Sequence, residues 1–282
     1  MEVRDVDVGL YRRQGLICVP GLWPAEVISG VLEEVESLFT RMLTHQGIPL
    51  PGPGPHWEAH LHTALITLFR QFPTSWAAVV SMVPFLPAVQ QLGIHPHLLN
   101  LLRQVGLDSP CPCTPPIAYF LSEDMAWPGD LHRAPAHQDW RYTQGSVDMV
   151  TVWVPLVEVD PSRGSLEWIP GSHRRGLLPT SGHPHLHKVA DHALGDIPFQ
   201  AVHLKPGGVA LFSGFTVHRS GINRSGVVRW AVAFRFNNLG DPTFIHRGLP
   251  NPYHFIPRTD LVTPGFPSAE DLARIFGRGP AE

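Results

Sequence analysis

The hydrophobic positions in the first hundred residues follow a helical period. A proline at position 24 suits the first turn of a helix, and helical patterns resume at 57–71 and, less regularly, at 74–92. The segment 96–106 begins with proline and ends with glycine, as short helices do. We therefore expect largely helical structure here, with one short strand at 16–19. The clearest period, at steps of three and four, comprises Val27, Ile28, Val31, Leu32, Val35, Leu38, Phe39 and Met42.

Beyond residue 110 the pattern changes to short apolar runs rich in Val, Phe, Trp and Ile. Turn sequences such as PSRG, PGSHRRG, KPGG and NRSG separate these runs, which favours short β-strands. Several such strands in succession predict a β-sandwich or barrel. The runs are PPIAYFLSE, VTVWVPL, SLEWIP, FQAVHLK, GVALFSG and VVRWAVAFRF.

The expected fold class is α+β with a mainly β core, in which N-terminal helices support a β-sandwich. No linker divides the chain, so we expect a single domain over residues 1–282. Its parts are a mostly helical support at 1–110, a β core at 111–240 and a C-terminal extension at 241–282. The extension is predicted to end in a helix with Ser268 as its N-cap.

Composition and charge exclude several function classes. A hydrophobic content of 43% and a charged content of 16% are typical of an ordinary globular protein. The net charge of −3 and the lack of a basic run argue against nucleic acid as a partner. No apolar stretch approaches the length of about 18 residues that spans a bilayer, and the N-terminus lacks an apolar secretion core. The sequence therefore predicts a cytoplasmic protein without a membrane partner.

The three cysteines are too few for a disulfide framework. Cys111 and Cys113 are separated by one proline, whereas zinc sites space their cysteines by about two to four residues. We interpret Cys18 and this pair as reduced thiols, with the pair in a proline-rich turn.

A candidate metal site begins at residues 136–140, which read A-H-Q-D-W. In a strand, His137 and Asp139 would point to the same face, where an imidazole and a carboxylate can reach one cation. With 17 histidines in the chain, such a pair also arises easily by chance, so a third ligand is needed. His218 follows an apolar run and can return beside an earlier strand. Two imidazoles and one carboxylate leave three coordination positions free, as in non-haem Fe(II) sites that bind a cosubstrate and O2.

A candidate anion anchor lies close to His218 in the sequence. Arg229 sits in the apolar run VVRWAVAF, where burying a guanidinium is costly unless it is paired. No carboxylate is close by in the sequence, and a bound carboxylate would resolve the cost through two parallel hydrogen bonds. Ser220 could add a hydroxyl to the same carboxylate.

Taken together, these motifs resemble the phytanoyl-CoA dioxygenase family of Fe(II)/2-oxoglutarate oxygenases. The resemblance covers residues 10–237, and it includes the N-terminal stretch YRRQGLICVPGLWP. The most specific matches are the tripeptide 137–139, SRGSLEWIPGSH at 162–173, HRSGIN at 218–223, and the arginine at 229 with the serine at 220.

The resemblance implies a double-stranded β-helix, that is, a jelly-roll or cupin-like core. It further implies Fe2+ bound by the triad 137/139/218, and 2-oxoglutarate whose far carboxylate binds Arg229 and Ser220. Relatives often place pocket residues at the positions of Trp153 and Tyr119, although each could equally be a core residue. The implied reaction is hydroxylation of an unactivated C–H of a small metabolite by O2, with release of succinate and CO2. Halogenating relatives carry a small residue where Asp139 stands, which favours hydroxylation here.

Two alternatives remain on the same fold: a non-oxygenase metal-dependent enzyme, and a catalytically dead 2-oxoglutarate-binding protein. Consumption of 2-oxoglutarate with release of succinate separates both from an oxygenase. The chain shows no basic patch suited to the phosphates of coenzyme A. We interpret the histidine-rich segment 183–192 as a polar loop covering the site rather than a second metal site, and His173, Arg174 and Arg175 as exposed turn charges.

Overall fold

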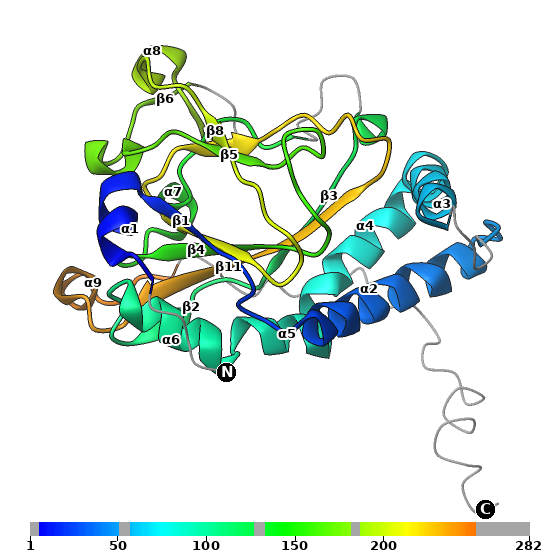
Figure 1. Ribbon diagram of the computed structural model, residues 1–282, viewed down its shortest axis with the longest axis horizontal. Coiled ribbons are helices and arrows are strands. Elements are labelled where there is room, and N and C mark those ends of the chain that lie inside the picture. Colours follow the sequence, from blue (N-terminus) through cyan, green and yellow to red (C-terminus); the bar gives the residue numbers. More distant parts are fainter. Residues whose placement is uncertain (1–5, 51–56, 127–132, 182–186, 252–282) are drawn as a thin grey trace, which may run out of the picture. The chain divides into compact units, whose positions relative to one another are not determined.

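The computed structural model describes residues 6–50, 57–126, 133–181 and 187–251 (Figure 1). The predicted terminal helix, with its N-cap Ser268, lies outside the described residues. So do the first four residues of the histidine-rich segment. Both interpretations therefore stay predictions.

Helices account for most of the chain up to residue 104, as predicted, with strand β1 (Leu16–Val19) among them. The less regular helical pattern at 74–92 corresponds to separate helices, because Pro84 and Pro87 lack the N–H that a continuous helix needs. A proline occupies a first-turn position in α4, η1, α5 and α6, whereas Pro24, predicted for a first turn, takes the N-cap position of α2. The helices are α1 (Val8–Gln14), α2 (Ala25–His45), α3 (Trp57–Gln71), α4 (Pro73–Met82), the 3-10 helix η1 (Val83–Phe85), α5 (Pro87–Gly93) and α6 (Pro96–Gln104).

Two antiparallel sheets form the core. The larger has the strand order β1-β9-β4-β11-β2, with β3 also paired to β11. The smaller has the order β10-β5-β8 and lies over one face of the larger sheet (Figure 1). The bounds are β2 (Pro110–Pro112), β3 (Ile117–Leu121), β4 (Val150–Pro155), β5 (Leu166–Trp168), β8 (Gln200–Ala201), β9 (Val209–Ser213), β10 (His218–Ser220) and β11 (Arg229–Asn238).

The remaining elements are short and lie in the connections between strands. A two-stranded ribbon pairs β6 (Thr180–Ser181) with β7 (Lys188–Val189). The short helices are η2 (Glu123–Met125), α7 (Trp140–Thr143), η3 (Ser172–Arg175), α8 (Asp191–Leu194) and α9 (Pro242–His246). The expected fold class, a jelly-roll core supported by N-terminal helices, is confirmed.

Strand β11 is buried along its whole length because both of its faces are covered. Its even-numbered residues, such as Trp230, pack with the helices in one hydrophobic cluster. Ala231 and Ala233 belong instead to the cluster between the sheets, together with Trp153. Arg229 and Arg235 have the same parity as these alanines and therefore point to the same inner face. One strand thus carries two arginines into the space between the sheets.

The cysteine prediction is correct for the thiols and wrong for the local structure. All three thiols are free. Cys111 lies in strand β2 rather than in a turn, where it is paired with Asn237 of β11. No local feature of the proline-rich segment indicates this pairing, because β11 lies more than a hundred residues away in the chain.

None of the described helices could cross a membrane alone, although the bent pair Pro73–Phe85 and Pro87–Gln104 together has the length and composition to do so.

Candidate metal centre

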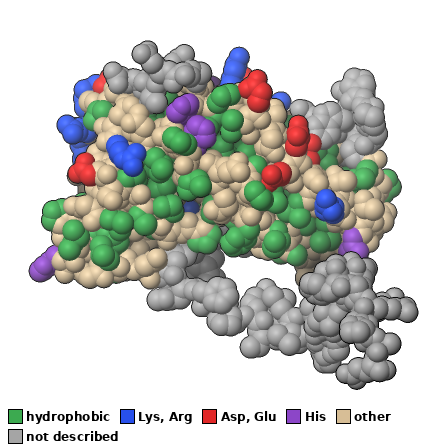
Figure 2. All heavy atoms as spheres, turned by 90° about the horizontal axis from the view of Figure 1, so that it is seen from below, with side chains coloured by type: hydrophobic (Ala, Val, Ile, Leu, Met, Phe, Trp, Pro, Cys, Tyr) green, Lys and Arg blue, Asp and Glu red, His purple; other side chains and the backbone are tan. Residues whose placement is uncertain are grey.

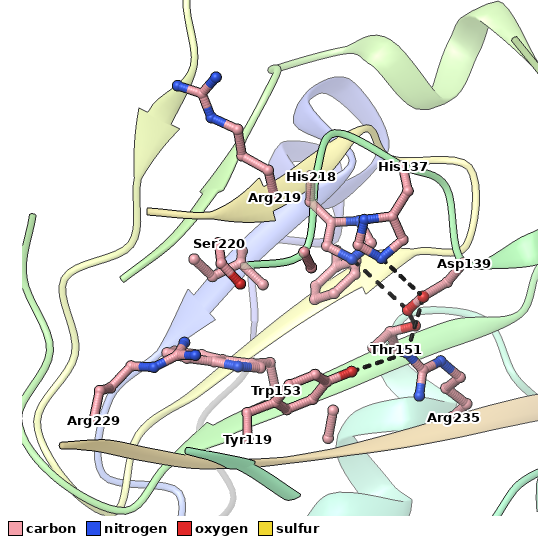
Figure 3. Close-up of a pocket in the computed structure, with 14 residues that line it drawn as sticks. Tyr119, His137, Asp139, Thr151, Trp153, His218, Arg219, Ser220, Arg229 and Arg235 are labelled. Carbon is pink, nitrogen blue, oxygen red and sulfur yellow. Dashed lines mark hydrogen bonds and ion pairs between the residues drawn. The ribbon is translucent and has the colours of Figure 1, made fainter. Parts of the chain in front are cut away.

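The three predicted ligands converge between the sheets (Figure 3). His137 forms an antiparallel bridge with His218, and their imidazole centroids are 4.1 Å apart. The Nε2 atom of His137 is 3.6 Å from Asp139 Oδ1, and that of His218 is 3.9 Å from Asp139 Oδ2. One candidate ligand atom from each residue lies within 4.8 Å of the others, and within the described parts of the chain this is the only cluster of its kind.

The route by which Asp139 reaches this cluster differs from the prediction. Its backbone is not extended but helical, and it occupies the N-cap position of α7 without a capping hydrogen bond from its side chain. The bridge to β10 therefore includes His137, and the chain turns directly after it. Trp140 N donates to Gly214 O at 3.0 Å, which anchors that turn to the segment leading to His218. The side chains of His137 and Asp139 lie close together because of this turn, and not because of the alternation of side chains along a strand.

Backbone carbonyls determine the tautomers of both histidines. His137 Nδ1 lies 2.7 Å from Pro135 O, and His218 Nδ1 lies 3.0 Å from Thr216 O. A carbonyl oxygen can only accept, so each Nδ1 carries the hydrogen and each Nε2 presents a lone pair to the cluster. Burial, followed by the neighbouring imidazole, lowers the pKa of His218 to about 3. This imidazole is therefore neutral at neutral pH, as metal binding requires.

Asp139 is 1% exposed and is held by two donors. Arg235 NH2 donates to Oδ1 at 2.9 Å, and Thr151 Oγ1 donates to Oδ2 at 2.7 Å. Burial alone would raise the pKa of this carboxyl, but the Arg235 guanidinium outweighs burial and holds the pKa well below its usual value. The site therefore offers a buried carboxylate and two imidazole lone pairs, the donor set of a non-haem Fe(II) site.

All seven residues predicted for the site line one cavity. Arg229 and Ser220 lie across this cavity from Asp139, and Figure 3 shows the Ser220 hydroxyl directed into it. Trp140 does not line it: its indole Nε1 donates to Ser146 O, and its ring stacks on Phe215. The predicted residues that the cavity brings together are Tyr119, His137, Asp139, Trp153, His218, Ser220 and Arg229.

Arg229 is the buried cation that the sequence led us to expect. It is 2% exposed, and its Nε has no hydrogen-bond partner among the described residues. Its guanidinium carbon lies 5.6 Å from the centroid of the Trp153 ring. Burial lowers the pKa of Arg229 to about 10, so the side chain remains charged at neutral pH. A buried cation without a carboxylate partner fits an anionic ligand in the cavity.

Sequence reasoning missed two groups of residues around the ligands. Thr151 and Arg235, which hold Asp139, were not selected, although Arg235 interrupts the same apolar strand as Arg229 and could have been found by the same argument. Gln138, the middle residue of the motif at 137–139, was not assigned a role either. Its Nε2 donates to Gly176 O at 2.8 Å and to Phe215 O at 2.7 Å, and its Oε1 accepts from Leu178 N at 2.8 Å.

The basic cluster at 173–175 lies in η3 and does not line the cavity. Arg174 and Arg175 are exposed, as expected, and donate to the carbonyls of Arg12 and Leu194 respectively. From the described part of the histidine-rich segment, the His187 backbone N–H donates to the Tyr142 hydroxyl at 2.9 Å. Whether this segment covers the cavity stays a prediction.

Comparison with protein-family models matches residues 92–231 to phytanoyl-CoA dioxygenase (PhyH). The chain belongs to the PhyH family. No curated protein matches it in sequence. The matched range includes strands β2 to β10, the start of β11, all three candidate ligands and Arg229.

Solved structures share the PhyH fold of this chain at low identity. The epimerase SnoN, in complex with Fe3+, alpha ketoglutarate and nogalamycin RO, has a TM-score of 0.57 at 20% identity, over 89% of this chain and 90% of that one. The carbocyclase SnoK from nogalamycin biosynthesis has a TM-score of 0.52 at 17% identity, over 89% and 92%. EctD from S. alaskensis, with 2-oxoglutarate and 5-hydroxyectoine, has a TM-score of 0.53 at 17% identity, over 83% and 76%.

Proposed function

We propose that this PhyH-family protein is an Fe(II)- and 2-oxoglutarate-dependent oxygenase that hydroxylates an unactivated C–H of a small metabolite and releases succinate and CO2. One observation carries the proposal: a buried cluster of two imidazoles and one carboxylate shares a cavity with Arg229, a buried cation without a carboxylate partner among the described residues. A metal-chelating keto acid with a second carboxylate matches both ends of such a cavity.

Each residue has a definite task in this proposal. The Nε2 atoms of His137 and His218 and the carboxylate of Asp139 would hold the iron. Arg229 and Ser220 would bind the far carboxylate of 2-oxoglutarate. When bound, the iron would couple oxidative decarboxylation of 2-oxoglutarate by O2 to oxidation of a substrate C–H.

The other pocket residues shape the space and exclude water. Trp153 and Tyr119 provide aromatic walls, and β11 places small side chains opposite them. In the strand register, Ala233 is paired with Trp153 and Ala231 with Tyr119. This combination of large and small side chains leaves room for a ligand while keeping the surroundings apolar.

A second candidate function is a reaction that breaks a C–H bond of the substrate but adds no oxygen to the product. SnoN is named as an epimerase and SnoK as a carbocyclase, so the fold of this chain also serves reactions other than hydroxylation. For this chain, ring closure would use the same metal ligands and the same cosubstrate anchor, and the two hydrogens lost by the substrate would reduce the second oxygen atom of O2 to water. Epimerisation returns a hydrogen to the carbon, so it would also need an external two-electron reductant, such as ascorbate, to reduce that oxygen atom.

The decisive experiment measures succinate formed from 2-oxoglutarate with Fe(II) and O2, across a panel of small metabolites. We expect one class of substrate to raise succinate above the uncoupled background, and we expect Asp139→Ala to abolish this increase because the metal loses its only carboxylate ligand. The exposed Asp196→Ala is the matched control and should behave as wild type.

The outcomes separate the candidate functions. Label from 18O2 in a new hydroxyl supports hydroxylation, whereas an unlabelled product supports epimerisation or cyclisation. A wild-type rate in Asp139→Ala would refute the ligand assignment. Metal binding without any consumption of 2-oxoglutarate would favour a non-oxygenase enzyme or a binding protein without turnover.

A further inference from the structure

Arg235 contacts the candidate metal ligand Asp139 but has no role in the proposed function. It is 5% exposed, and its NH2 donates to Asp139 Oδ1 at 2.9 Å. The same nitrogen lies 3.4 Å from the Tyr119 hydroxyl. Its Nε and NH1 have no hydrogen-bond partner among the described residues. The contact with Asp139 is therefore the main compensation for burying this guanidinium.

The two oxygens of Asp139 are engaged differently. Oδ2 accepts from the neutral hydroxyl of Thr151, whereas Oδ1 accepts from a cation. A charge-assisted hydrogen bond is about twice as strong as a neutral one. A carboxylate can bind a metal through one oxygen or through both, and a guanidinium next to Oδ1 both competes for its lone pairs and repels a metal cation there.

We propose that Arg235 is a positioning residue that restricts Asp139 to a single metal-bound oxygen, and thereby keeps three coordination positions free. The inference rests on the proposed function. Three single-atom protein ligands leave three positions on an octahedral metal. A chelating keto acid would use two of them and leave the third for O2, so a second oxygen from Asp139 would compete directly with O2.

The position of Arg235 is fixed by its strand. β11 is paired with β4 on one side and with β2 and β3 on the other, so its backbone cannot shift easily. Arg229 and Arg235 are separated by about 20 Å along the strand and point to the same face, with Ala231 and Ala233 between them. Strand β11 therefore places Arg229 at the far end of the cavity and Arg235 next to the carboxylate of Asp139 (Figure 3).

The test uses nitric oxide as a stand-in for O2 and compares Arg235→Met with Arg229→Met, the same substitution on the same face of the same strand. Both variants and the wild type are loaded anaerobically with Fe(II), with and without 2-oxoglutarate. The visible charge-transfer absorption of the Fe(II)–2-oxoglutarate chelate reports cosubstrate binding, and electron paramagnetic resonance reports nitric oxide binding.

We expect Arg235→Met to form the chelate but to bind nitric oxide roughly tenfold or more weakly in its presence. Without 2-oxoglutarate, positions are still free, so its nitric oxide affinity should equal that of wild type. Arg229→Met should show the reverse pattern, with weaker 2-oxoglutarate binding and normal nitric oxide affinity without cosubstrate. Arg235→Lys, which keeps a cationic donor, should recover part of the loss.

A wild-type nitric oxide affinity in the Arg235→Met chelate would overturn this role. A purely structural role for Arg235 predicts equal losses with and without 2-oxoglutarate, which would overturn it too. If circular dichroism shows that Arg235→Met is unfolded, Arg235→Gln, which keeps a neutral donor, carries the same comparison. A wild-type protein that forms no chelate would instead refute the proposed function itself.

Discussion

At the scale of single residues, buried polar side chains hold the candidate metal centre in shape. Thr151 and Arg235, which are 12 and 96 residues away in the sequence, hold Asp139. Main-chain carbonyls two residues before each histidine orient the two imidazoles. These hydrogen bonds give the site rigidity. The Nε atoms of Arg229 and Arg235, and NH1 of Arg235, have no hydrogen-bond partner among the described residues.

Gln138 shows how much one such residue contributes. Gln138→Ala would leave two carbonyls and one amide N–H without their side-chain partner, and each buried unpaired group costs about 1–3 kcal/mol. We therefore expect the free energy of unfolding in urea to fall by about 3 kcal/mol. The exposed Gln200→Ala should change it by less than about 0.5 kcal/mol. Equal stabilities of the two variants would show that Gln138 is not a structural anchor.

At the scale of elements, the helical layer supports the strand that carries both pocket arginines. Phe39 of α2 lies at the centre of this contact, with ring centroids 5.1 Å from Phe120, 5.4 Å from Trp76 and 5.9 Å from Trp230. Trp230 lies on the outer face of β11, next in the strand to Arg229, which lines the cavity on the inner face. Helix packing on the outer face therefore fixes the strand from behind.

The packing of α2 can be tested by Phe39→Ala. Phe39 is completely buried, so removing its ring should lower the free energy of unfolding by about 3–5 kcal/mol. Phe85→Ala is the matched control, because Phe85 is 59% exposed and its loss leaves no cavity. Chemical denaturation measures both variants. A loss for Phe39→Ala as small as that for Phe85→Ala would mean that α2 does not stabilise the sheet.

At the scale of the whole molecule, the site brings together segments that are far apart in the sequence. The bridge between His137 and His218 extends the smaller sheet, while Arg229 belongs to the larger one. A metal and a dicarboxylate bound between them would link the two sheets. Because these ligand positions exist only in the folded state, binding must raise the stability of the fold.

This linkage predicts a thermal shift. With Fe(II) and 2-oxoglutarate each present anaerobically at about a hundred times its dissociation constant, each should add about 2.7 kcal/mol. The melting temperature should then rise by about 5 °C or more, and a chelator should reverse the metal's share. Asp139→Ala should show little response to the metal. An unchanged melting temperature in wild type, measured by calorimetry, would contradict binding at this site.

The sequence alone determined what depends on local periodicity and on motif spacing. The helical pattern of α2, the succession of short strands, the three candidate ligands and Arg229 were all recognisable, because each depends on a few neighbouring residues or on the motif spacing of the PhyH family. An arginine in an apolar strand was enough to select Arg229 as a candidate.

Only the tertiary structure decided which distant groups meet. It placed Asp139 in a turn rather than in a strand, paired Cys111 with β11, and brought Arg235 and Thr151 to the two oxygens of one carboxylate. These contacts depend on the register of strands that are distant in the chain and on the packing of whole layers. No local pattern encodes that register, because it results from the free energy of the complete fold.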